Sequence, residues 1–211
     1  MPMTRIAILA SGNGTDCEAV ITAVEQGQIP DAGVAVVIAD RNAPVLERAR
    51  RHGVTVLLID RRGLGRASHD TALATALAEY RVDLVVLAGY LSIVGGAMVT
   101  TYRNRIINVH PSLIPAFCGH GFYGERVHQA VLDAGVKLTG VTVHFVDEGT
   151  DSGPVILQEA VNVLDTDDAA TLAARVLVVE HRLLPQAVAL YCSGRLSVQG
   201  RQVHILGEER K

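Results

Sequence analysis

The sequence contains no tryptophan, and aromatic residues make up only 4% of its 211 residues. Proteins that bind single-stranded nucleic acid stack bases on aromatic rings, so this composition argues against such a surface. The formal net charge is −3. It gives no electrostatic reason to expect nucleic acid or an anionic membrane as a partner. We therefore expect small-molecule partners and no nucleic acid.

Cysteine and long apolar runs are scarce as well. Cys17, Cys118 and Cys192 form no C-x-x-C pair, which predicts a reducing compartment and neither a structural disulfide nor a zinc site. The apolar run in residues 1–10 is too short for a signal peptide. Residues 84–88 have the length of a strand, far below the roughly 20 residues of a membrane span. We expect a soluble, cytoplasmic protein with no membrane partner and no metal.

What the sequence has in quantity is apolar residues, which form 49% of the chain against 19% charged residues. A sizeable core can therefore form. Strands are predicted at 5–10, 33–40, 54–59, 84–88 and 106–110, and helices at 17–26, 43–52 (with Asn42 as its cap), 68–80 and 96–102. This alternation predicts an α/β fold with a doubly wound, mostly parallel sheet and helices on both faces.

The second half of the chain has a different order of elements. It predicts a helix at 126–134, strands at 138–145 and 155–163, a long amphipathic helix at 168–190 and a hairpin at 196–206. Pro185 should kink or break the long helix. Repeats, low-complexity segments and linkers are absent from the sequence. We therefore predict one domain over residues 1–211, made of a phosphate-binding half (1–105) and a catalytic half (106–211).

A glycine loop, Ser11-Gly12-Asn13-Gly14-Thr15-Asp16, follows the first predicted strand. In doubly wound folds, backbone N–H groups at this position bind phosphate. A dinucleotide fingerprint would need a third glycine at the position of Cys17, although Asp40 could still bind a ribose in a nicotinamide oxidoreductase. A cradle for a single phosphate is the second possibility, and a glycine-rich turn without a ligand is the third.

Residues 106–115, I-I-N-V-H-P-S-L-I-P, read as a buried strand that Pro111 ends. Asn108 and His110 are two residues apart, so on a strand their side chains share a face. An amide can stabilise an oxyanion, and an imidazole can exchange protons near neutral pH. In isolation, the same tripeptide would more often be a turn cap beside a packed histidine.

Two segments carry a family resemblance. N-V-H-P-S-L-I-P at 108–115 and H-F-V-D-E-G-T-D-S-G-P at 144–154 resemble, in order and in approximate separation, the active-site segment and acidic loop of the folate-dependent formyltransferases. The resemblance covers nearly the whole chain. It implies transfer of the formyl group of the co-substrate 10-formyltetrahydrofolate to the amine of glycinamide ribonucleotide, a step of purine biosynthesis, without a metal. A monomer or a homodimer is expected.

The same resemblance implies roles for individual residues. Asn108, His110 and Asp151 match the catalytic positions, whereas spacing alone leaves Asp147, Glu148 and Asp151 open as the acid. Binding of the ribonucleotide is assigned to Gly12, Asn13, Gly14, Thr15, Asp16 and Glu180. Binding of the folate is assigned to Arg66, Leu91, Ser92, Ile93, Val94, Asn108, Asp147, Glu148, Gly149, Thr150 and Asp151. His144, on the preceding strand, could line the pocket, and we expect it instead to pack behind the site.

The sequence also departs from the family's pattern. Asp16 stands where the family commonly has Asn, and we expect Asp16 to cap the following helix while backbone amides hold the phosphate. Arg66 is assigned to the folate tail, with a solvated arginine as the alternative. The loop at 117–125 is unusually aromatic, and its glycines allow a hinge next to the active site.

Four other functions are alternatives to this transfer reaction. Methionyl-tRNA formyltransferase has a further C-terminal domain, and formyltetrahydrofolate hydrolase a further N-terminal domain. We expect neither domain, because the first strand begins at residue 5 and the fold uses the 211 residues. A non-catalytic nucleotide-binding module and a nicotinamide oxidoreductase would make the set of Asn108, His110 and Asp151 superfluous.

Overall fold

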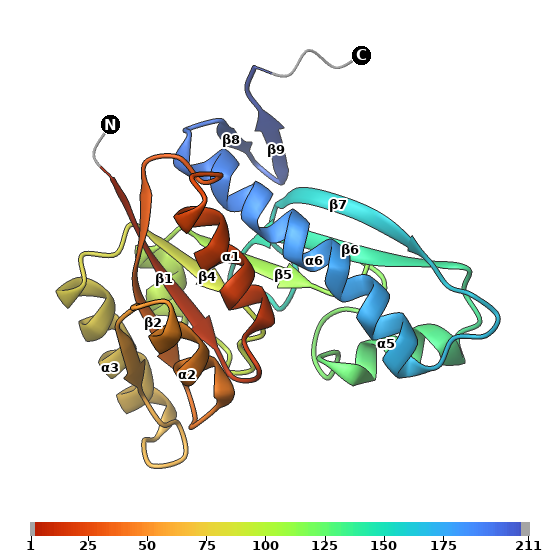
Figure 1. The fold of residues 1–211 in the computed structure, drawn as a ribbon, viewed down its shortest axis with the longest axis horizontal. Helices are drawn as coiled ribbons and strands as arrows, with labels where there is room; N and C mark the ends of the chain where they lie inside the picture. Colours follow the sequence, from red (N-terminus) through yellow and green to blue (C-terminus); the bar gives the residue numbers. More distant parts are fainter. Residues whose placement is uncertain (1–2, 208–211) are drawn as a thin grey trace. The chain divides into compact units, whose positions relative to one another are not determined.

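The structure is a computed structural model that describes residues 3–207 and divides into two compact units, one up to Ile107 and one from Asn108 onward. Figure 1 colours their elements along the chain. This division falls close to the predicted boundary between residues 105 and 106. The single domain predicted over 1–211 stays a prediction, and its outermost residues, 1–2 and 208–211, lie outside the described part.

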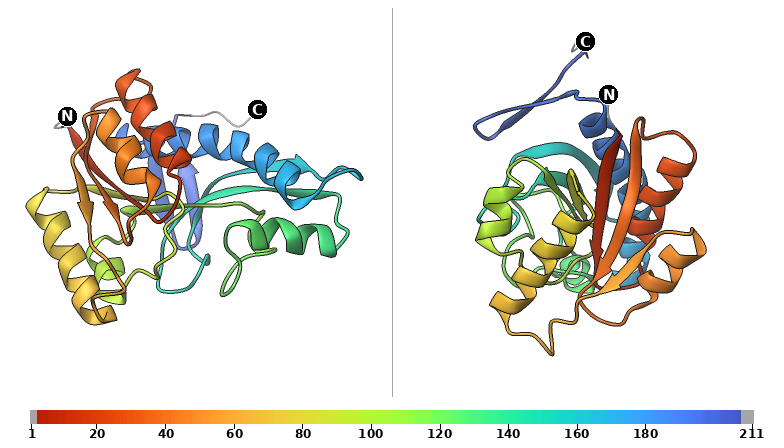
Figure 2. Two further views of the ribbon diagram at one scale, coloured as in Figure 1. Left: turned by 60° about the horizontal axis from the view of Figure 1, so that its bottom comes forward. Right: turned by 90° about the vertical axis from the view of Figure 1, so that its left-hand side faces the viewer.

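The first unit alternates strands and helices. Its elements are β1 Thr4–Ala10, α1 Thr15–Glu25, β2 Ala32–Ala39, α2 Pro44–Arg51, β3 Val56–Leu58, α3 Arg66–Glu79, β4 Leu84–Leu87 and α4 Gly96–Thr101. The strands pair in parallel in the order β3-β2-β1-β4. Figure 2 shows α1 and α2 on one face of these strands and α3 on the other. The predicted doubly wound, mostly parallel arrangement is thereby confirmed.

β1 forms the centre of this unit because it pairs with β2 on one side and β4 on the other. Both of its faces are covered, which explains its continuous apolar run. Ile6, Ile8 and Leu9 have no exposed surface. The predicted cap of α2 is wrong: the N-cap is Ala43 instead of Asn42, and no side chain caps the helix. Pro44 opens α2, and a proline there needs no partner for a backbone N–H.

β5, Ile106–His110, begins in the first unit and ends in the second. The further elements of the second unit are α5 Glu125–Asp133, β6 Leu138–Phe145, β7 Val155–Asn162, α6 Ala169–Cys192, β8 Leu196–Gln199 and β9 Gln202–Ile205. β6 and β7 pair antiparallel, and so do β8 and β9, which form the predicted hairpin. In Figure 1, α6 runs along β6 and β7 and packs against both.

α6 corrects one expectation about proline. The helix is 24 residues long and includes Pro185, so the predicted break is wrong, while the alternative of a kink stays a prediction. Burial of residues such as Leu172 and Leu184 along its packed face offsets the hydrogen bond that the proline cannot make. A capping box fixes its start, with Asp168 accepting from the Thr171 N–H at 2.7 Å and donating its own N–H to the Thr171 hydroxyl at 2.9 Å.

Across residues 3–207, no helix combines the length and the apolar character that crossing a bilayer requires.

Candidate active site

Three of the predicted catalytic residues meet in the second unit. Asn108 and His110 come from β5, and Asp151 comes from the loop between β6 and β7. The Asp151 carboxylate lies 3.7 Å from His110 Nδ1 and 3.9 Å from His144 Nε2. Asn108 Nδ2 lies 3.1 Å from His144 Nε2. The structure therefore gathers Asn108, His110 and Asp151 around a fourth polar residue, His144.

His144 is a neutral hydrogen-bonding partner in this group. Its Nδ1 lies 2.8 Å from the Phe145 carbonyl oxygen, which can only accept, so Nδ1 carries the proton. Burial lowers the pKa of His144, although the Phe145 carbonyl and Asp151 oppose that effect. With Nδ1 protonated, the neutral ring accepts a hydrogen bond from the Asn108 amide at Nε2. The buried histidine predicted behind the site thus fixes the orientation of Asn108.

His110 has an acceptor at each ring nitrogen. Its Nε2 lies 2.9 Å from the Phe117 carbonyl oxygen, and its Nδ1 faces Asp151. The side chain is 6% exposed. The Nε2 contact is a hydrogen bond to a carbonyl that can only accept, so Nε2 carries a proton, whereas the 3.7 Å between Nδ1 and the carboxylate is an ion-pair distance. The Phe117 carbonyl is a contact that the sequence did not reveal, because it depends on the backbone of the aromatic loop.

The loop between β6 and β7 separates the three candidate acids. Asp151 has a positive φ of 53°, which Asp tolerates better than most residues, and accepts a hydrogen bond from the Gly119 N–H at 2.9 Å. Asp147 instead closes its own turn by accepting from the Gly149 N–H and the Ser152 hydroxyl. Glu148 is exposed. Asp151 is thus the acid that reaches both histidines, and Gly119 is a partner that sequence reasoning missed.

The glycine loop lies in the first unit. Gly14 is the N-cap of α1 in a left-handed conformation, with a φ of 77°, and no side chain caps the helix. The expectation that Asp16 caps α1 is therefore wrong, because the helix begins at Thr15 and places Asp16 inside its first turn. On the other side of the loop, the Ser11 hydroxyl accepts from the Leu91 N–H at 2.8 Å. Gly12 and Asn13 occupy the predicted turn, and Thr15 is the first residue of α1.

The segment assigned to the folate also lies partly in the first unit. Leu91 and Ile93 expose their side chains, and Val94 is half-buried. Ser92 is buried, and its hydroxyl donates to the Asp40 carboxylate. The Ser92 side chain is therefore engaged within the protein, and its assignment to the folate stays a prediction. Arg66 is exposed at the start of α3.

Asp40 bears on the alternative of a nicotinamide enzyme. Its carboxylate accepts from Arg41 at 2.9 Å and 3.1 Å and from Ser92. Burial raises the pKa of Asp40, but the hydrogen bonds from Arg41, Ser92 and Ser11 outweigh burial and lower it. The residue is 1% exposed. A ribose hydroxyl would have to displace these protein donors.

The remaining assigned residues lie in the second unit. Glu180 is buried near the middle of α6, while Gly149 and Thr150 are exposed in the loop between β6 and β7. Among residues 3–207, no three His, Cys, Asp or Glu side chains are grouped in a way that could hold a metal ion.

Comparisons with known proteins identify a family for the chain. The formyl transferase family matches residues 4–188. A phosphoribosylglycinamide formyltransferase of Bacillus subtilis is 35% identical over 88% of this chain and 93% of its own length. The trifunctional purine biosynthetic protein adenosine-3 of Bos taurus is 39% identical over 93% of this chain, which spans only 19% of that protein.

A solved structure supports the same relationship. The crystal structure of glycinamide ribonucleotide transformylase 1 from Symbiobacterium toebii has a TM-score of 0.91 and 49% identity, covering 97% of this chain and 94% of that one. Its fold is the α/β fold described above. The chain therefore belongs to the formyl transferase family, within the group of the phosphoribosylglycinamide formyltransferases.

Proposed function

We propose that this protein transfers the formyl group of 10-formyltetrahydrofolate to the amine of phosphoribosylglycinamide, that is, glycinamide ribonucleotide. Relatives of similar length carry the name of this activity. The observation that carries the proposal is the set of Asn108, His110 and Asp151 gathered around the neutral His144. A nucleotide-binding module would have no use for this set.

The chemistry follows from the donors in this set. The substrate amine attacks the formyl carbon, and the carbonyl oxygen becomes an oxyanion in a tetrahedral intermediate. Asn108 gives one amide hydrogen to His144, so its second amide hydrogen can stabilise the oxyanion. Protonated His110 adds positive charge, and Asp151 stabilises that charge. The amine nitrogen loses a proton and the departing folate nitrogen gains one, through His110, Asp151 or water.

One contact must change for His110 to act. The Phe117 carbonyl accepts from His110 Nε2 in this structure. A substrate oxygen can receive that N–H only after the carbonyl has moved away. The loop at 117–125 contains Gly119, Gly121 and Gly124, each with a positive φ. We therefore assign to this loop a rearrangement that releases His110 when substrates bind.

Binding of the two substrates is proposed on the family's pattern. The ribonucleotide phosphate would bind the glycine loop, whose helix begins without a side-chain cap. The assigned residues of the loop are Gly12, Asn13, Gly14, Thr15 and Asp16, and Glu180 would bind the ribose. The folate would bind Arg66, Leu91, Ser92, Ile93, Val94 and the 147–151 loop. We also propose the cytoplasm as the compartment and a monomer or homodimer as the assembly.

The test is an assay for tetrahydrofolate release from 10-formyltetrahydrofolate, with and without glycinamide ribonucleotide. We expect release only with the ribonucleotide. Asn108→Ala should lower kcat by roughly a hundred- to a thousandfold, the loss typical of one oxyanion donor. Asn162→Ala, at an exposed position of β7, is the matched control and should keep the wild-type rate. Release without the ribonucleotide would support the hydrolase instead, and no release in either condition would refute both enzymes.

A further inference from the structure

Helix α2 holds two successive carbonyl groups of the glycine loop. The Val45 N–H donates to the Gly12 carbonyl oxygen at 3.2 Å, and Arg48 Nε donates to the Asn13 carbonyl oxygen at 3.0 Å. Both donors are in the same helix, Pro44–Arg51. These contacts tie the loop to α2 at one side.

These two hydrogen bonds fix the direction in which two N–H groups of the loop point. In a trans peptide, the carbonyl and the N–H of the next residue point in opposite directions. The carbonyls of Gly12 and Asn13 point at α2, so the N–H groups of Asn13 and Gly14 point away from it. Successive N–H groups that point to the same side form an anion-binding concavity. The Arg48 hydrogen bond thus sets the orientation of the peptide between Asn13 and Gly14.

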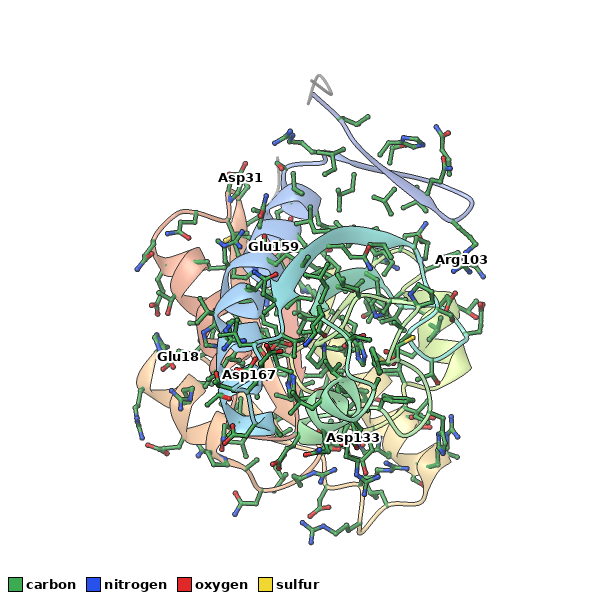
Figure 3. All side chains as sticks on the ribbon, turned by 90° about the vertical axis from the view of Figure 1, so that its right-hand side faces the viewer. Glu18, Asp31, Arg103, Asp133, Glu159 and Asp167 are labelled. Atoms are coloured by element: carbon green, nitrogen blue, oxygen red, sulfur yellow. The ribbon has the colours of Figure 1, made fainter. Side chains whose placement is uncertain are left out.

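The charge around the loop also depends on Arg48. Asp16 and Glu18 lie in the first turn of α1, where negative side chains would repel a phosphate. Arg48 forms an ion pair with Glu18, a residue labelled in Figure 3. Burial, Asp16 and Glu18 raise the pKa of the Cys17 thiol to about 12, while Arg48 opposes that effect. Arg48 therefore reduces the negative field at the start of α1.

We propose that Arg48 is a positioning residue for the ribonucleotide phosphate, acting without touching it: it orients the Gly14 N–H through the Asn13 carbonyl and neutralises Glu18. This inference rests on the proposed function, which supplies the phosphate. Lysine should replace arginine poorly, because an arginine presents a fork of donors that reaches a carbonyl and a carboxylate at once.

The experiment measures the Kd of glycinamide ribonucleotide alone by calorimetry, and kcat and both KM values in the formyl transfer assay. In Arg48→Gln we expect the Kd and the KM of the ribonucleotide to rise about tenfold. The value of kcat and the KM of the folate should stay as in the wild type. Arg48→Lys should show an intermediate loss. Arg50→Gln, which removes an exposed arginine of the same helix, is the matched control and should change nothing.

A substrate without its phosphate separates positioning from a general weakening of the fold. For the 5′-dephosphorylated nucleoside, Arg48→Gln and the wild type should have the same kcat/KM. An unchanged Kd for the ribonucleotide in Arg48→Gln, or an equal loss with the nucleoside, would overturn the inference. If Arg48→Gln does not fold, the same comparison with Arg48→Lys, which keeps the positive charge and loses the fork of donors, decides it. Wild-type protein that binds the ribonucleotide without transferring formyl would refute the proposed function, and the calorimetric Kd values of Arg48→Gln and the wild type would still test this inference.

Discussion

Replacement of Gly14 by alanine tests how the glycine loop is built. Gly14 has a φ of 77°, in the left-handed region. A Cβ atom added there would lie 2.4 Å from Val45 Cγ2, 2.6 Å from Val45 Cβ and 2.9 Å from Val45 Cα. Val45 is fully buried, so its side chain has little room to move. The substitution therefore combines backbone strain with a steric clash.

The two effects can be given magnitudes. The left-handed conformation costs alanine about 1–2 kcal/mol, and the extra atom in a packed site costs about 1–3 kcal/mol. Gly14→Ala should therefore lower the free energy of unfolding by about 2–5 kcal/mol, a large part of the ~5–15 kcal/mol of a typical domain. Gly12 has no heavy atom within 4 Å of an added Cβ. Gly12→Ala should therefore lower the free energy of unfolding by less than about 1 kcal/mol.

Denaturant unfolding without ligands compares the two variants with the wild type. Midpoints and slopes from urea titrations give the free energies of unfolding. If Gly14→Ala and Gly12→Ala differed by less than about 0.5 kcal/mol, the close packing between the glycine loop and α2 would not exist in solution. In that case the peptide orientations inferred from the hydrogen bonds of α2 would be wrong as well.

Three further predictions concern stability. Hydrogen bonding to Glu25 raises the pKa of His52. The wild type should therefore be more stable than His52→Gln below about pH 6.5, and this difference in unfolding free energy should vanish as the pH rises through the pKa of His52 in the folded protein. Urea unfolding at a series of pH values measures the difference. Asp168→Ala removes the cap of α6 and should lower the Tm at neutral pH more than Asp165→Ala at an exposed position nearby, measured by circular dichroism. Leu172→Ala leaves a cavity at a fully buried position and should lower the unfolding free energy by about 2–5 kcal/mol. Urea titration measures this loss as well.

Much of the fold could be predicted because strands such as β1, β4 and β5 are buried over most of their length. The periods of 2 and 3.6 residues and the continuous apolar runs identify such elements, and β5 and β6 begin and end where the sequence predicted. Helix starts were predicted less well. Asn42 and Asp16 have the chemistry of caps, but Pro44 begins α2 without a side-chain cap, and the N-cap of α1 is the left-handed Gly14. At both helix starts, backbone geometry determined the N-cap residue, and the capping propensity of the nearby side chain did not.

The fate of Pro185 has a different cause. Proline breaks helices because it lacks an N–H and crowds the preceding turn, which is a local effect of about 3 kcal/mol. Burial of the packed face of α6 is a tertiary effect spread over many residues, among them Leu183, Leu184 and Val188. Several buried aliphatic side chains contribute more than one proline costs. A prediction made from single residues cannot compare the local cost of the proline with the stabilisation from burial of the whole helix face.

The candidate site was predictable in its residue types and not in its protonation states. His110, His128 and His144 have the same side chain and differ in what surrounds it. Two acceptors face His110, the carbonyl of Phe117 and the carboxylate of Asp151. Burial lowers the pKa of His128 on α5 and of His144 on β6, and His144 additionally receives the amide of Asn108.

These differences arise from main-chain atoms and from burial, and the type of a residue reveals neither of them. The motif at 108–115 names a histidine that could exchange protons, yet the partner of its Nε2 is a carbonyl seven residues away in a loop with a positive φ at Phe117. The neutral state of His144 likewise depends on the Phe145 carbonyl and on burial. Because Asn108 donates to that neutral ring, burial on β6 decides which amide hydrogen on β5 is left, and this is the hydrogen that we propose for the oxyanion.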